Sequence, residues 1–296
     1  MKRRIPTVLL YTGFGLAVLV LLAAIKFPWP VLADRLVSAV NSTGAVRLSY
    51  LEARSSRFPP GLVLEGVALA SAQDPDTPLF TAGRVRISPA WLSLLTGRAG
   101  VKLRAEAYGG EVRGRVTADG INSPENVQVA LDLVGLDLAR HPRLAEQAGM
   151  QGLLSGRVGL AGPLNGTEGF RSKAELVLTG GAARYKSDLL TRDVIRLGTV
   201  RADLSWLGGR LGVERLALAD GDLQGEIKGA FQPGQGEASL RGGRLTVDGS
   251  LRVEPSLLHL DRIPDRSVAD RVRRNEPLHP QWDGPVAPLV ALAGLL

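Results

Sequence analysis

Apolar and polar residues alternate one by one along most of this chain, from about Ala45 to Val253. Alternation with a period of two is typical of a β-strand that buries one face and exposes the other. The clearest case is the stretch Val101–Ala118, VKLRAEAYGGEVRGRVTA. Its Gly109-Gly110 pair can adopt the positive φ angles of a two-residue hairpin turn. The stretch therefore predicts a hairpin with one apolar and one charged face.

A second hairpin is predicted around Gly208-Gly209. A two-residue turn there puts Trp206 opposite Leu211 and Leu204 opposite Val213, all on one face. Strands that are neighbours in sequence are then neighbours in the sheet, which predicts an antiparallel meander.

A third turn is predicted at Asp220-Gly221, and it places Leu218 opposite Leu223. This register conflicts with the preceding one, because the apolar residues change from odd to even positions within a single strand. One extra residue near Glu214-Arg215, a β-bulge, resolves the conflict.

The expected fold class is mainly β: an N-terminal transmembrane helix, then a long curved antiparallel meander that forms a groove or half-barrel, with a few short helices. The expected helices are 31–42, 89–96 and 138–147. The expected strands are 45–53, 62–70, 79–87, the two arms of 101–118, 127–136, 153–160, 173–180, 195–206, 210–218, 223–231, 238–240 and 244–253, with a further turn at Gly242-Gly243.

The N-terminus predicts a membrane anchor. Lys2, Arg3 and Arg4 precede Ile5–Ile25, which holds no charged residue. About 20 apolar residues span a bilayer core as a helix, and the cations before them favour a cytoplasmic N-terminus. A cleaved signal peptide is the alternative, although its apolar region usually covers only about 7–15 residues. The expected domains are a stub and anchor (1–26), an amphipathic connecting helix (27–44), a β-groove domain (45–258), and a charged linker with an apolar tail (259–296).

Composition narrows the function classes. The chain has 296 residues, a formal net charge of +7, no Cys, 36 Gly and 5% aromatic residues. The cations are spread over nearly every segment, without the clustered patch and interleaved aromatics that a nucleic-acid site needs. The histidines, His141, His259 and His279, lack ligand-type neighbours at metal-site spacing, and no phosphate-binding glycine loop or nucleophile elbow is present. We therefore predict a protein that is not an enzyme and holds no metal or cofactor.

The candidate functional surface is the apolar face of the meander. Small apolar residues with few aromatics suit a groove about 10 Å across that could hold acyl chains, whereas two sheets packed on a dry core are the alternative. The candidate residues facing this groove are Val101, Leu103, Val112, Val116, Leu204, Trp206, Leu211, Val213, Leu223 and Ile227.

Two stretches carry a family resemblance. The first is Phe58–Ala70 (FPPGLVLEGVALA) followed by Leu79–Val116, with its short Leu-Leu helix and Tyr-Gly-Gly hairpin, and the second is Leu131–Pro163. Their layout resembles the AsmA-like superfamily of inner-membrane-anchored periplasmic proteins. Within it the chain is most similar to the type II secretion system protein N (GspN) family, in its form of about 300 residues. The charged segment Leu260–Pro280 departs from that pattern.

The resemblance implies an accessory component of the type II secretion system in a bacterial inner membrane. It implies a single span, a cytoplasmic N-terminus and a periplasmic bulk. The implied partners are inner-membrane and periplasmic secretion proteins, with phospholipid as a further candidate ligand and no nucleic acid. The alternative is a lipid carrier or lipid-homeostasis factor that shields acyl chains in the groove. The family has no catalytic residues to transfer.

Overall fold

The computed structural model describes residues 29–42, 44, 46–56, 60–90, 93, 98–120, 125–163, 169–234 and 243–285. The expected anchor at 1–26, strand 238–240, Gly242, residues 286–296 of the expected tail and most of the expected helix 89–96 lie outside these ranges. No helix in the described ranges combines the length and the apolar character needed to cross a membrane.

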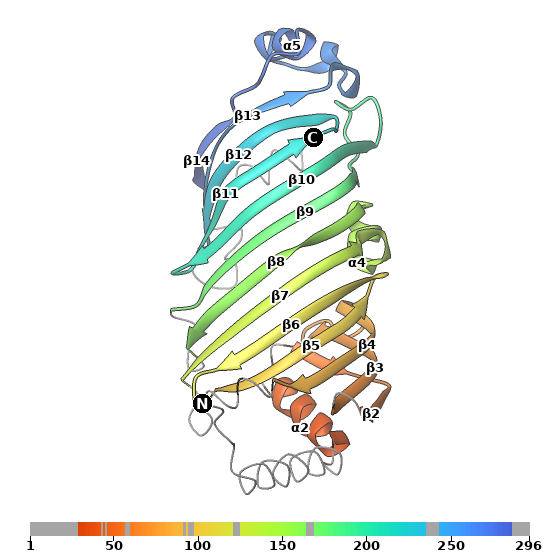
Figure 1. Ribbon diagram of the computed structural model, residues 1–296. Coiled ribbons are helices and arrows are strands. Elements are labelled where there is room, and N and C mark those ends of the chain that lie inside the picture. The colour runs from red at the N-terminus through yellow and green to blue at the C-terminus, as the bar shows by residue number, and fades with distance from the viewer. Residues whose placement is uncertain are drawn as a thin grey trace, which may run out of the picture. The chain divides into compact units, whose positions relative to one another are not determined.

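The fold is mainly β, as predicted, with one large antiparallel sheet of 14 strands that does not close on itself (Figure 1). Along the sheet the order is β1-β3-β4 and then β5 to β14 in sequence, with β2 paired to β3. The strands are β1 (Val46–Ser49), β2 (Glu52–Ser56), β3 (Gly61–Ser71), β4 (Pro78–Pro89), β5 (Ala99–Ala107), β6 (Gly110–Ala118), β7 (Asn126–Asp137), β8 (Gln151–Pro163), β9 (Arg171–Arg184), β10 (Val194–Leu207), β11 (Arg210–Ala219), β12 (Leu223–Gln232), β13 (Arg244–Val253) and β14 (Gln281–Pro285). The helices whose bounds the structure describes are α2 (Trp29–Asn41), η1 (Leu138–Arg140), α4 (Pro142–Ala148), η2 (Pro255–Leu257), η3 (Leu260–Arg262) and α5 (Arg266–Arg273).

The chain divides into two compact units. The first comprises Met1–Ala90 with Val101–Ala105 and contains α2 and strands β1 to β4. Its strands have a well-buried apolar side, where Leu62, Leu64 and Val67 are at most 6% exposed. Helix α2 packs against β1, β2 and β3 and supplies part of this burial.

Hydrogen bonds as well as packing hold helix α2 against the sheet. Ala33 of the helix is fully buried. The Tyr50 hydroxyl donates a hydrogen bond to the Asp34 carboxylate. The side chain of Asn41 at the helix end pairs with the backbone of Leu48, accepting from its N–H at 2.7 Å.

The second unit comprises Trp91–Gly100 and Glu106–Leu296 and contains the meander from β6 to β14. The predicted register around Gly208-Gly209 is confirmed, because Trp206 lies opposite Leu211 and Leu204 opposite Val213. The predicted bulge is confirmed as well. Asp203 pairs with Arg215, so Glu214 is the extra residue of β11.

The register predicted at Asp220-Gly221 is wrong by two residues. Leu218 lies opposite Gly225 rather than Leu223. The cause is Asp222, whose carboxylate is held by the backbone N–H of Arg196 in β10. A shift of two residues leaves each side chain on its predicted face. The first hairpin also turns one residue earlier than predicted, at Tyr108-Gly109, where φ is +52° and +76°.

The segment expected to be a charged linker, 259–280, is instead a folded cap at the end of the meander. Val272 of α5 is 1% exposed and packs with Leu257 and Val253. Its helix buries Ala269 and Val272 on one side while Arg271 and Arg273 stay exposed on the other. After the cap, β14 returns to pair with β13, with Trp282 opposite Val247.

Candidate functional site

One face of the meander carries apolar side chains in rows that run from strand to strand. Consecutive registers define these rows, since residues paired across an antiparallel ladder point to the same face. The first row is Leu131, Val158, Ala174, Leu204, Val213, Gly229, Val247 and Trp282. The second row is Leu133, Gly156, Leu176, Ala202, Leu216, Ile227 and Gly249. We call this surface of β7 to β14 the apolar face.

The structure brings most of the predicted groove residues onto this one face. The members from β10 to β12 are Leu204, Trp206, Leu211, Val213, Leu223 and Ile227. Val112 and Val116 of β6 adjoin it, opposite Leu133 and Val129. Val101 and Leu103 belong to the other compact unit, and Val101 is 39% exposed.

The prediction missed the middle of the apolar face. Leu131, Leu133, Val158 and Leu176 lie between the predicted groups, on β7, β8 and β9. A signal for the β7 residues was present, because Val127–Leu136 alternates as regularly as the first hairpin. Strands β8 and β9 place Gly, Ser and Ala among their inward residues, which weakens the alternation there.

The side chains of the apolar face are half-buried rather than buried. Leu131, Val158, Leu204 and Val213 all fall in this intermediate range. In the described part of the chain, the extensive packing of β7 to β12 is with sheet neighbours, and at β8 also with η1. The shielding of these side chains therefore comes mainly from their neighbours in the sheet.

Buried clusters mark two places along the second unit. Leu136 and Leu138 are buried where β7 runs into η1. The rings of Tyr108 and His141, which flank these elements in sequence, lie 5.1 Å apart. The cap of Val253, Leu257 and Val272 forms the other cluster. Between them, the apolar face of β8 to β12 offers a surface suited to an extended apolar ligand or a partner surface.

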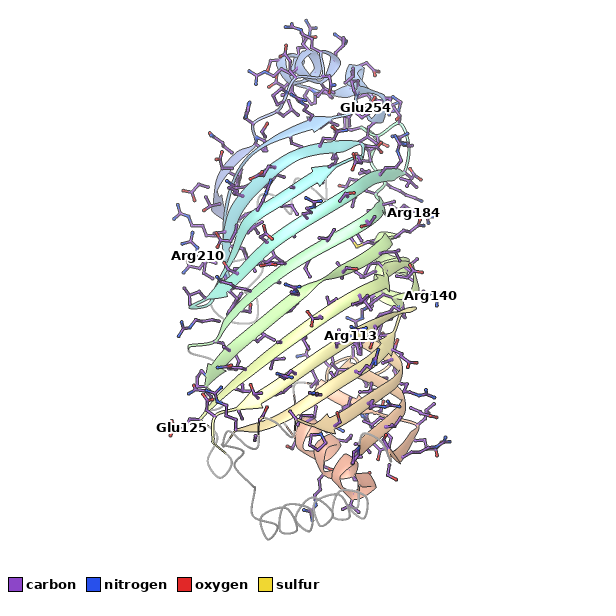
Figure 2. The ribbon with its side chains drawn as sticks, viewed as in Figure 1. Arg113, Glu125, Arg140, Arg184, Arg210 and Glu254 are labelled. Carbon is purple, nitrogen blue, oxygen red and sulfur yellow. The ribbon has the colours of Figure 1, made fainter. Side chains whose placement is uncertain are left out.

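The opposite, polar face carries a row of charged residues of both signs, in which the two acidic residues Glu175 and Asp203 are neighbours. The row runs Arg113, Asp132, Arg157, Glu175, Asp203 and Arg215 across β6 to β11. Arg157 and Asp132 form an ion pair at 3.6 Å, and both are well exposed. Figure 2 shows the side chains along the sheet, with Arg113 labelled on β6. Such exposed pairs favour solubility and contribute little to stability.

A buried carboxylate, Asp222, is 1% exposed next to the cap. It accepts hydrogen bonds from the backbone N–H of Arg196 at 2.8 Å and from Arg196 Nε at 3.0 Å. Arg192 Nη2 lies 2.7 Å from the same carboxylate. Burial acts to raise the pKa of Asp222, but the hydrogen bonds and the arginine charges outweigh it and hold the pKa below its ordinary value. Because its oxygens are already bound, the carboxylate serves to tie β10 to β12.

His141 has a structural role at the start of α4. Its Nδ1 accepts a hydrogen bond from the backbone N–H of Leu144 at 3.4 Å and so caps α4. Within the described ranges, no three His, Cys, Asp or Glu side chains come together as metal ligands would.

Comparison with known proteins gives no match: no protein-family model, no curated protein and no solved structure matches the chain. Among the described residues, the apolar face of β7 to β14 runs across more strands than either buried cluster of the second unit.

Proposed function

We propose that this protein is an accessory component of a type II secretion apparatus that works by binding. In this proposal an N-terminal span holds it in the bacterial inner membrane and the sheet lies in the periplasm. The single observation that carries the proposal is the apolar face of an open antiparallel sheet, with no extensive packing over β7 to β12 beyond sheet neighbours and η1 in the described ranges. The layout of Phe58–Ala70, Leu79–Val116 and Leu131–Pro163, which resembles the secretion protein N family, supports the same reading.

Two surfaces suit a protein partner. The apolar face offers contiguous half-buried side chains, and such patches are characteristic of interaction sites. Strand β14 is a sheet edge in the described ranges, paired on one side with β13. An edge strand can accept a strand from another chain through its free backbone groups.

A lipid carrier is the second candidate, and the dimensions of the apolar face favour it. Neighbouring strands lie about 4.8 Å apart, so the eight strands from β7 to β14 extend the rows over roughly 34 Å. One leaflet of a bilayer core is about 15 Å thick. An acyl chain would therefore fit along the rows, with its methylene groups removed from water.

Site-specific photo-crosslinking in intact cells tests both candidates on the full chain. A photoreactive residue at Leu204 reports on the apolar face, and one at the adjacent Ser205 reports on the polar face as a matched control. Secretion proteins captured from Leu204 but not from Ser205 support the first candidate. Phospholipid captured with the same asymmetry supports the second.

Two outcomes would overturn the proposal. Equal capture from both positions would mean that the apolar face is not a binding surface. No adduct from Leu204, in cells where an active secretion apparatus is present, would mean that the face is covered by the chain's own residues.

A further inference from the structure

The polar face of the second unit contains a hollow of about 450 Å³ over β6, β7, β8 and β9. Two adjacent cross-strand rows supply eight of its lining residues, and Val129, Leu160 and Ser172 complete the lining. The first row is Arg115, Ala130, Gly159 and Lys173, and the second is Thr117, Gln128, Ala161 and Arg171. The outer strands β6 and β9 carry the long cationic side chains, and the inner strands carry mostly small residues. The hollow therefore has a low floor between raised, positively charged walls.

The three cations of the hollow have no ion-pair partner among the described residues. Arg115, Arg171 and Lys173 make no side-chain hydrogen bond or ion pair with any residue that the structure describes. The next row of the same face behaves differently, because Arg157 there is paired with Asp132 at 3.6 Å. No acidic side chain is among the residues that line the hollow. Three like charges around one depression repel one another, and a bound anion would relieve that repulsion.

Gly159 leaves the floor of the hollow open. A Cβ at this position would meet nothing closer than the Lys173 carbonyl oxygen at 4.0 Å, and its φ is not positive. Gly156 in the same strand is different, since a Cβ there would lie 2.2 Å from the Glu175 carbonyl oxygen. Neither crowding nor backbone conformation explains Gly159. A glycine inside a strand weakens it and often marks a place where a ligand approaches closely.

We propose that this hollow binds the phosphate group of a phosphorylated small molecule or of a lipid headgroup. Arg115 and Arg171 supply planar guanidinium groups that can donate paired hydrogen bonds to phosphate oxygens, and Lys173 supplies a point charge. The volume lies in the range of small-molecule sites, about 300–1,000 Å³, and leaves room for an organic group over Ala130, Gly159 and Ala161. This site lies on the opposite face from the proposed secretion or lipid surface and does not depend on that function.

Calorimetric titration of the full chain in non-ionic detergent tests the proposal with two probes, glycerol phosphate and a short-chain phosphatidic acid. Binding of glycerol phosphate assigns the site to soluble phosphoesters, and binding of phosphatidic acid alone assigns it to headgroups. We expect the double substitution Arg115→Gln and Lys173→Gln to weaken binding at least tenfold. The control Arg157→Gln, which removes one cation from the neighbouring row of the same face, should change it less than twofold.

Gly159→Val provides a test that leaves every charge in place. Valine favours strands, so folding should be unaffected, while its side chain fills the floor and should weaken binding at least tenfold. The proposal is overturned if neither probe binds the unaltered protein. It is also overturned if Arg157→Gln weakens binding as much as the double substitution, since the effect is then general electrostatic attraction.

Discussion

Strands β2 to β4 and strands β7 to β12 have similar alternating sequences and different surroundings. In the first group Leu62, Leu64 and Val85 are at most 6% exposed, and α2 packs against β2 and β3 of this sheet. In the second group Leu131 and Leu204 are only half-buried. Alternation thus determines which face of a strand is apolar, but a different part of the chain determines whether that face is covered.

The difference has a local origin. Helix α2 comes directly before β1, so a short connection brings it to the strands that follow. In the described ranges, the helices between β7 and β12 are η1 and α4, which cover 138–148 and adjoin the end of β7. They are too short to cover a sheet of this width, because a seven-residue helix is only about 10 Å long.

Replacing a leucine by alanine should give the largest difference in free energy of unfolding between the two regions. Leu62→Ala should lower the free energy of unfolding of the first unit by about 3 kcal/mol, because it leaves a cavity in a closed core. Leu131→Ala should cost about 1 kcal/mol, since water already reaches its side chain. Hydrogen exchange measured separately for the two units gives both values. Equal costs would mean that the apolar face is as well covered as the first core.

Replacing the buried Asp222 should lower stability at the cap end of the second unit about as much as a substitution in a closed core. Asp222→Asn should cost about 2 kcal/mol, because it weakens charge-assisted hydrogen bonds in a buried place. The exposed Asp220→Asn, in the same turn, is the matched control and should be nearly neutral. Local hydrogen exchange of β10, β12 and the cap reports the difference.

The lowered pKa of Asp222 also predicts a pH dependence. A carboxyl group whose pKa is depressed by folding contributes stability above its unfolded pKa of about 3.9. That stability is lost as the pH falls through the lower folded pKa. The cap should therefore loosen below about pH 4 in the unaltered protein and show a weaker acid dependence in Asp222→Asn.

Removing an ion pair from a polar face should change the free energy of unfolding least, and by the same amount in both regions. Glu65→Gln removes pairs with Arg54 and Arg84, and Asp132→Asn removes the pair with Arg157. Each should change the free energy of unfolding by less than about 1 kcal/mol, since all these groups retain access to water. A large loss from either one would show that the two regions differ in their polar faces too.

Local sequence signals account for the parts of the fold that were predicted correctly. The Gly208-Gly209 turn sets the register of Trp206 and Leu211 because a two-residue loop leaves no slack. The bulge at Glu214 follows from a change of parity within ten residues. In both cases the residues that decide the structure are close together in sequence.

Contacts between residues far apart in sequence account for the features of the fold that were not predicted. The register at Leu218 depends on Asp222 binding Arg196, 26 residues away. The cap depends on Val272 meeting Val253 and Leu257, which the charged sequence around α5 conceals. Strand β14 has too few apolar residues to show alternation.

The candidate sites divide in the same way. The apolar residues of β10 to β12 were predicted because each strand alternates on its own. The hollow on the polar face could not be predicted in this way. Arg115 and Lys173 are 58 positions apart, and only the combined registers of β6 to β9 bring them into one row.

From β6 to β13 each strand pairs with the strands immediately before and after it in the chain. Contacts of this kind are short in sequence, so the meander can assemble by successive addition of hairpins instead of a single global collapse. Its stability is then approximately a sum over neighbouring pairs, as in repeat proteins. A consequence is that the length of the sheet is evolutionarily adjustable: one hairpin can be gained or lost without redesign of a common core.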